Sequence, residues 1–263
     1  MTWGTFTLQH ILSLAAIVGI AVSLYFILKQ VSDKIKIKIL FAVSLLGVAA
    51  VLYDLVRWGR PLEYLPLHLC SLNALIIPVA VLTRNKVAAH LTLAWSLGAA
   101  LVLVVNTGQA HYLMTSEAFW IFVVCHAVDV TVPALLFATG LVKFNVGKAP
   151  AVVGTTIAAY TCVHFINLGI NRYFIEKATE IAAYTFKRGG IPQVNYMYSL
   201  GDEGNAVFAI FREIIPYDYW HMYLIAPILV GFLFAIHFML LKKERAAEKR
   251  ALNKKAEKSS SNE

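Results

Sequence analysis

The stretch LPLHLCSLNALIIPVAVL, residues 65–82, decides the fold class because it is apolar enough to cross a lipid bilayer. Its first third nevertheless carries four polar or weakly polar side chains, those of His68, Cys70, Ser71 and Asn73. A polar group that faces lipid costs several kcal/mol, so such groups face protein or water. We therefore expect this segment to lie inside a bundle of membrane-spanning helices.

The rest of the chain has the same character. Hydrophobic residues make up 59% of its 263 residues and charged residues only 14%, and the mean hydropathy is +0.67. Runs of about 20 apolar residues predict seven transmembrane helices, near 8–28, 37–56, 65–82, 87–105, 118–142, 150–170 and 220–241. The alternating pattern of a β-barrel is absent. The sequence predicts an all-α polytopic membrane protein with one transmembrane domain, residues 1–241.

Basic residues predict the orientation of this domain. With the N-terminus outside, 16 lysines and arginines fall in the inner segments and seven in the outer ones, as the positive-inside rule requires. The C-terminal residues 242–263 hold eight basic and four acidic side chains. We expect a disordered cytoplasmic tail that touches anionic headgroups, and no nucleic-acid partner, because no such binding motif is present.

The longest outer segment, residues 171–219, is expected to be structured. Glycines and a proline punctuate it, but Tyr196, Tyr198 and Phe211 are among the large apolar side chains that separate it from disordered segments. A lid or an interfacial helix fits this composition. The three cysteines contain no C-x-x-C pair, so a disulfide framework is not expected.

The predicted topology gathers polar residues in the outer half of the membrane. Cys70 and Asn73 share one helix face at a spacing of three, and so do His126 and Asp129. Asn106 and Gln109 accompany the histidine of the outer loop between the fourth and fifth spans. Six histidines are expected in the outer half, namely His10, His68, His111, His126, His164 and His221. Asn167 and Asn171 follow His164 at spacings of three and four and so lie on the same helix face. We expect one outward-facing polar cavity.

A thiol beside an imidazole can form and release a thioester. Cys70 lies in the first turns of its span, where the helix N-terminus favours the thiolate, and His126 lies at a comparable depth. Asp129, one turn below, is expected to hold the other ring nitrogen of His126, although the pair is also compatible with a structural hydrogen bond. An inert buried Cys70 stays open as an alternative, and so does Cys162 as the functional thiol.

The chain resembles a known family in four short motifs. These are PLHLCSL (66–72), NTG (106–108), NYMY (195–198) and IPYDYWHMY (215–223). The chain is similar to the YwaF-type bacterial integral membrane proteins, which are related to eukaryotic transmembrane acyltransferases of ether phospholipid synthesis. The resemblance covers nearly the whole seven-span body and implies a bacterial plasma membrane location. It implies a cysteine and a histidine as the active residues, without free coenzyme A, and no cofactor is expected.

The leading hypothesis is therefore acyl transfer between a glycerophospholipid and a lysophospholipid. The motif match assigns the nucleophile to Cys70, with His126 as the proton carrier and His111 or His164 as alternatives for that role. Asn73 or His68 is expected to stabilise the oxyanion. The further expected substrate-binding residues are His111, His164, Asn167, Asn171, Tyr196, Tyr198 and His221.

Three other functions stay open from the sequence. Water as the acceptor would make the same site a lipase or thioesterase. A transporter or ligand-binding protein is a weaker fit, since no inverted repeat is visible. A metal or haem protein would need ligands from several helices, because H-x-x-x-H, H-E-x-x-H and C-x-x-C are all absent.

Overall fold

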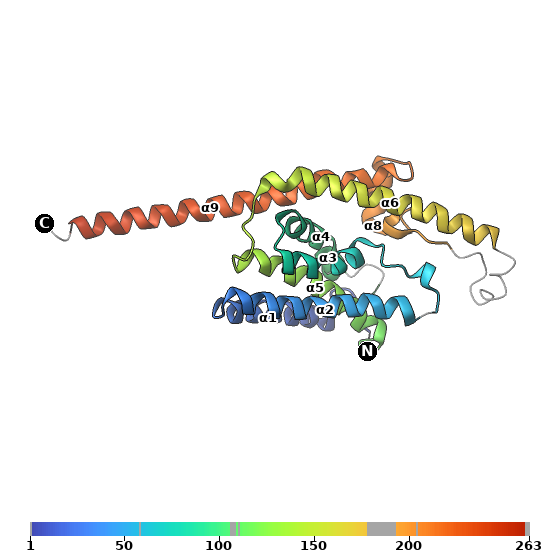
Figure 1. Cartoon of the computed structure of the whole chain (residues 1–263), viewed down its shortest axis with the longest axis horizontal. Coiled ribbons are helices and arrows are strands. Elements are labelled where there is room, and N and C mark those ends of the chain that lie inside the picture. The colour runs from blue at the N-terminus through green and yellow to red at the C-terminus, as the bar shows by residue number, and fades with distance from the viewer. Residues whose placement is uncertain are drawn as a thin grey trace.

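The computed structural model describes residues 2–57, 59–105, 109, 111–177, 193–203 and 205–260, and these residues are predominantly helical (Figure 1). Within them, six helices are long and apolar enough to cross a membrane. These helices are α1 (Leu8–Lys29), α2 (Asp33–Arg57), α4 (Lys86–Val105), α5 (Glu117–Ala138), α6 (Ala149–Glu176) and α9 (Ile225–Ser260). The predicted class, an all-α polytopic membrane protein, is confirmed.

The predicted third span is shorter than expected. Helix α3 runs over Leu69–Thr83 and has 15 residues, which rise only about 22 Å. Residues 64–68 form a loop with several bends in place of helix, because Pro66 disfavours a helical conformation in Leu65, the residue that precedes it. His68 is the extended N-cap of α3, with φ −70° and ψ 152°. The polar start of the segment is thus a loop that leads into a short buried helix.

Helices α6 and α9 are longer than the predicted spans. Helix α6 continues to Glu176, where Arg172 and Glu176 form an exposed ion pair at a spacing of four, with Nε and Oε1 2.7 Å apart. Helix α9 continues to Ser260 and projects from the body (Figure 1). The segment expected to be a disordered tail is therefore helical through that residue.

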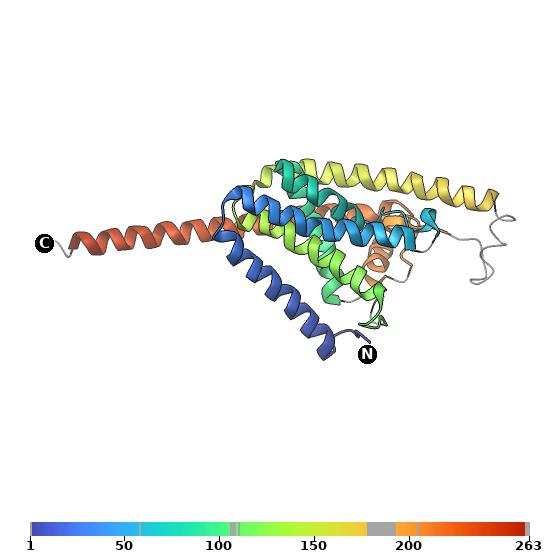
Figure 2. The same cartoon turned by 60° about the horizontal axis from the view of Figure 1, so that its bottom comes forward.

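Helices α2, α3, α4 and α5 pack against one another as an inner bundle. Gly47 of α2 marks the closest approach, because a Cβ atom there would lie 3.1 Å from Val128 Cγ1 of α5 and 3.5 Å from Ala74 Cβ of α3. Helices α6 and α9 pack on α4 and on each other. Helix α1 contacts α5 and runs at an angle to α2 (Figure 2).

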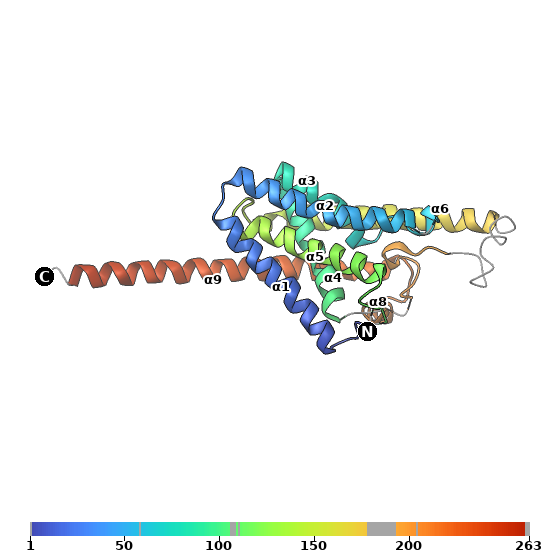
Figure 3. The same cartoon turned by 90° about the horizontal axis from the view of Figure 1, so that it is seen from below.

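Several connections meet at one end of the bundle. The N-terminal segment joins the loop before α5, since the Trp3 amide donates to the Tyr112 carbonyl at 2.9 Å. The segment after α6 returns to this end with the 3-10 turn η3 (Tyr196–Tyr198), helix α8 (Ala206–Ile214) and the 3-10 turn η4 (Trp220–Leu224). Figure 3 shows α8 and the N-terminus at the same end, opposite the projecting part of α9. This end also holds the start of α3.

Candidate functional site

Cys70 occupies the second position of α3, at the end of the bundle where these connections meet. Its side chain is partly exposed, and it is a free thiol. One turn further along the helix, Ala74 packs with Cys125 of α5 and Val51 of α2 in one buried cluster. Cys70 and Cys125 are also close enough to Asp129 of α5 to interact with it electrostatically. The thiol therefore lies where α3 meets α5.

His126 presents the tautomer that a general base requires. Its Nδ1 lies 2.7 Å from the Phe122 carbonyl, which can only accept, so Nδ1 carries the proton. Nε2 then holds the lone pair, and among the described residues it makes no hydrogen bond, to Cys70 or to any other group. The ring is almost fully buried and packs on Phe122.

The predicted hydrogen bond from Asp129 to the His126 ring is wrong. The Phe122 carbonyl, four residues before His126 in the same helix, accepts the hydrogen bond from Nδ1 instead. Neither carboxyl oxygen of Asp129 makes a hydrogen bond in the described part of the chain. The carboxyl still lies close enough to the imidazole to interact with it electrostatically.

Two fully buried polar side chains in this region have no partners. Asn73 and Asp129 have no exposed surface, and their side-chain nitrogen and oxygen atoms make no hydrogen bond with the residues described. Each unpaired buried group costs about 1–3 kcal/mol. Pro78 and Pro133 cannot donate helical hydrogen bonds to the carbonyls four residues before them, those of Ala74 and Asp129. A ligand hydroxyl or carbonyl would satisfy such groups.

The start of α3 is held by a segment that we call the strap, residues 194–199. The Tyr196 hydroxyl donates to the Leu62 carbonyl at 2.6 Å and accepts from the Leu65 amide at 3.1 Å. Burial raises the pKa of Tyr196 to about 12, so the hydroxyl keeps its proton at neutral pH. The Met197 amide points to His68 Nδ1 at 3.4 Å. The NYMY and PLHLC motifs are thus joined in space.

Helix α6 holds the strap from the other side with two asparagines. Asn167 Nδ2 donates to the Tyr196 carbonyl at 2.8 Å, and Asn167 Oδ1 accepts from the Tyr196 amide at 3.0 Å. Asn171 pairs in the same way with the backbone of Val194, at 2.9 and 2.8 Å. Both amides therefore bind loop backbone rather than a neighbouring helix.

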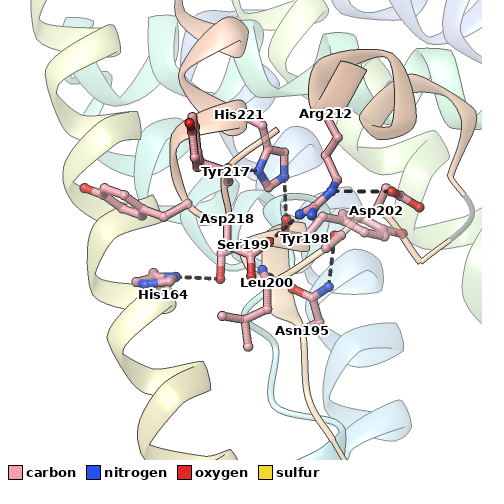
Figure 4. A network of polar contacts seen from close by, with 12 residues as sticks. His164, Asn195, Tyr198, Ser199, Leu200, Asp202, Arg212, Tyr217, Asp218 and His221 are labelled. Carbon is pink, nitrogen blue, oxygen red and sulfur yellow. Dashed lines mark hydrogen bonds and ion pairs between the residues drawn. The ribbon is translucent and has the colours of Figure 1, made fainter. Parts of the chain in front are cut away.

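His164 and His221 also contact the strap (Figure 4). His164 Nδ1 lies 3.1 Å from Ser199 Oγ, which also accepts a hydrogen bond from Asn167. His221 Nε2 lies 2.9 Å from the Tyr198 carbonyl. Ser199 is fully buried, and the sequence reasoning missed it because a serine in a loop carries no signal for such contacts.

The strap is strained where it passes the thiol. Met197 and Tyr198 have φ values of 56° and 57°, and non-glycine residues in this region cluster at functional sites. Burial raises the pKa of the Tyr198 phenol, and among smaller effects the nearby Cys70 raises it further. The Tyr198 ring lies 5.8 Å from the His68 ring, measured between centroids. The strap therefore lies next to the thiol.

The structure separates the remaining predicted site residues from Cys70. His10 is buried between the Phe6 amide and the Leu103 carbonyl, and His111 is exposed beside Tyr112. Cys162 is exposed on α6, two positions from His164, a spacing at which helical side chains do not face each other. The remaining polar residues form a buried group at the α3–α5 contact and a group that holds the strap.

Two further expectations concern the motif NTG and metal ligands. Residues 106–108, which make up that motif, lie outside the described residues. Among the residues described, no three histidine, cysteine, aspartate or glutamate side chains lie close enough together to hold a metal ion.

Comparison with known proteins gave one match. A family model described as the TMEM164 family matches residues 5–241. The curated proteins and the solved structures contain no match to this chain. The matched range includes the thiol, the buried group and the strap, and it ends before the basic part of α9.

Proposed function

Because this chain belongs to the TMEM164 family, a family of transmembrane proteins, we propose that its helical body catalyses a reaction of membrane lipids. The reaction is acyl transfer from a glycerophospholipid to a lysophospholipid through a thioester on Cys70. One observation carries the proposal. The thiol at the start of α3 shares the α3–α5 contact with an imidazole whose Nε2 is unoccupied and with two unpartnered polar side chains.

The first half-reaction forms the thioester. His126 Nε2 accepts the proton of the Cys70 thiol, and the sulfur attacks the ester carbonyl carbon of the phospholipid. The carbon–oxygen bond of the ester breaks, and His126 returns the proton to the leaving glycerol oxygen. Lysophospholipid leaves, and the acyl group stays on Cys70.

The second half-reaction regenerates the thiol. His126 takes the proton of a lysophospholipid hydroxyl, whose oxygen attacks the thioester carbon. The carbon–sulfur bond breaks, and the proton passes from His126 to Cys70. Water in place of the hydroxyl would give hydrolysis.

Donors for the oxyanion come from α3 and its N-cap. His68 Nδ1 accepts from the Met197 amide, so its Nε2 carries a proton and can donate. Asn73 Nδ2 has no partner among the described residues. We assign to Asp129 the binding of the lysophospholipid hydroxyl that accepts the acyl group, because both carboxyl oxygens of Asp129 lack a hydrogen-bond partner among the described residues at the same helix contact. One such donor lowers the barrier by about 3 kcal/mol in other enzymes.

The strap supports these roles from outside the buried group. We assign Tyr196, Asn167, Asn171, His164 and His221 to positioning, because their polar atoms contact the strap or the segment before α3. Tyr198 covers the thiol end of α3. A covered thioester is less accessible to water, which favours transfer over hydrolysis.

The experiment compares purified wild-type protein with Cys70→Ser in liposomes that contain a phospholipid with a labelled acyl chain and an unlabelled lysophospholipid. We expect transfer of label to fall by about a thousandfold or more. Cys162→Ser is the matched control and is expected to keep wild-type transfer, since Cys162 is exposed on α6 and not part of the α3–α5 contact. Equal turnover by wild type and Cys70→Ser contradicts the proposal, and labelled free fatty acid in place of labelled phospholipid identifies a hydrolase.

A further inference from the structure

Helix α8 has an apolar face that the rest of the described protein does not cover. Phe211 is buried on the inner side of the helix, and Phe208 is partly buried. Ile210 and Ile214 are 55% and 63% exposed, and Val207 is exposed too. These three residues follow a spacing of three and four, so they form one stripe along the helix. We call Val207, Ile210 and Ile214 the α8 stripe.

The orientation of the helix is fixed by ion pairs. Arg212, on the side away from the stripe, forms an ion pair with Asp218 and lies 3.7 Å, Nε to Oδ2, from Asp202 (Figure 4). Asn205 caps the helix by accepting from the Val207 amide at 3.1 Å. The stripe therefore faces outward in a defined direction.

The residues that follow α8 in the chain are typical of a membrane interface. Tyr217 and Trp220 follow α8 and are 68% and 56% exposed. The next helix is the membrane-spanning α9, with exposed Ile228 and Phe234. Tyrosine and tryptophan concentrate at the boundary between membrane and water. The position of α8 directly before this boundary places its stripe at the level of the lipid headgroups.

We propose that α8 is an interfacial helix that inserts its stripe into the boundary between the headgroups and the acyl chains of the bilayer. The partner is the phospholipid surface itself. A helix with one strongly apolar face lies in the plane of this boundary. Of the two charged residues of α8, Glu213 is exposed at the border of the stripe. The arginine at position 212 stays with its carboxylate partners on the protein side.

The other side of α8 contacts the strap. The Phe208 ring stacks on the Tyr198 ring, with centroids 4.3 Å apart and an angle of 27° between the planes. Helix α8 thus lies between the bilayer and the residue that covers the thiol end of α3. Contact with lipid on one side of α8 is coupled through this ring pair to the position of the strap.

Spin labels on two neighbouring residues test the insertion. Nitroxides are attached to Ile214→Cys and, as a matched control, to Glu213→Cys, which lies about 100° around the helix axis. Both variants carry Cys162→Ser to remove the exposed native thiol, and the Cys162→Ser parent supplies the background. The full-length proteins are reconstituted in phosphatidylcholine–phosphatidylglycerol liposomes. Frequent collisions of the nitroxide with oxygen indicate that it lies in lipid, and frequent collisions with a water-soluble nickel chelate indicate that it lies in water.

We expect the ratio of oxygen to nickel collisions to be several-fold higher at position 214 than at 213, with Ile210→Cys giving the same high ratio. Water-like ratios at 210 and 214 overturn the proposal. Shielding of 214 from both reagents, with spin–spin broadening, also overturns it, because a second copy of the chain would then cover the stripe. The readout does not depend on catalysis, so it stands apart from the proposed reaction.

Discussion

Asn73 and Asn167 are both fully buried, but only Asn167 has hydrogen-bond partners among the described residues. Asn167 of α6 makes three hydrogen bonds with the strap, whereas Asn73 of α3 makes none with the described residues. The two side chains are chemically identical and equally buried. A buried amide without partners lowers stability, so its presence at the thiol points to a role in binding.

Replacement of each asparagine by leucine separates these roles. Asn167→Leu leaves strap groups unpaired and is expected to lower the free energy of unfolding by about 3 kcal/mol. Asn73→Leu removes an unpaired group and is expected to leave stability unchanged or raise it by about 1 kcal/mol, while acyl transfer falls. Thermal unfolding in detergent measures stability. Equal destabilisation by both substitutions would show that Asn73 is a structural residue.

At the residue scale, the sequence indicates which polar residues share a helix face, but it does not indicate their hydrogen-bond partners. Helical spacing put Asn73 on the face of Cys70 and put Asp129 one turn from His126. Helical spacing does not identify the partner of His126 Nδ1, because the Phe122 carbonyl competes with the Asp129 carboxyl and accepts the hydrogen bond. Such competition depends on side-chain rotamers, which a single sequence does not specify.

At the scale of elements, the start of α3 depends on the strap. The Tyr196 hydroxyl bridges Leu62, in the 3-10 turn η1 (Pro61–Glu63), and Leu65, in the loop between that turn and the helix. Three residues after Leu65 the chain reaches the His68 N-cap, which is two positions before the thiol. The bridge therefore fixes the position from which α3 begins and, through it, the position of Cys70.

Tyr196→Phe tests this positioning because it removes both hydrogen bonds and keeps the ring. We expect faster deuterium uptake in residues 62–68, and kcat about tenfold lower with little change in KM, since small misplacements of reacting groups slow chemistry. Tyr173→Phe, at an exposed position of α6, is the control and changes neither quantity. Unchanged uptake at 62–68 in Tyr196→Phe would rule out the positioning role.

Several element boundaries followed from hydropathy, and two of those that did not have a common cause. Helices α4 and α5 begin within one residue of the predicted starts, because a helix that crosses the bilayer is apolar over its full length. The start of α2 and the end of α5 differ from the predicted bounds by four residues, and α9 continues past its predicted end. The start of α3 and the end of α6 were also misplaced, and these two share a cause. Both lie at the end of the bundle where the strap contacts them, and contacts between residues 62 and 196 leave no local pattern in the sequence.

At the scale of the whole molecule, alternate connections lie at opposite ends of the bundle. The start of α3, the strap and α8 share one end, and the projecting part of α9 lies at the other (Figures 1 and 3). Basic residues concentrate at the end with α9, which the positive-inside rule assigns to the cytosol. The thiol would then open toward the outer leaflet.

Fusions to the C-terminus test this orientation. In a bacterial host, a fluorescent protein fused after residue 263 is expected to fluoresce, and alkaline phosphatase at the same place is expected to stay inactive, because the orientation that we propose places the C-terminus in the cytosol. Truncation after Lys148, between α5 and α6, provides a second cytosolic fusion point. Active phosphatase and dark fluorescent protein at both positions would reverse the orientation.

The most direct test of the account looks for the acyl group on Cys70. The full-length protein is incubated in liposomes with a phospholipid of one defined acyl chain and no lysophospholipid, quenched in acid, and analysed by mass spectrometry. We predict a mass increase of one acyl group on the peptide that contains Cys70, removed by neutral hydroxylamine and by added lysophospholipid. An unmodified Cys70 in protein that transfers acyl chains when lysophospholipid is supplied would contradict the account.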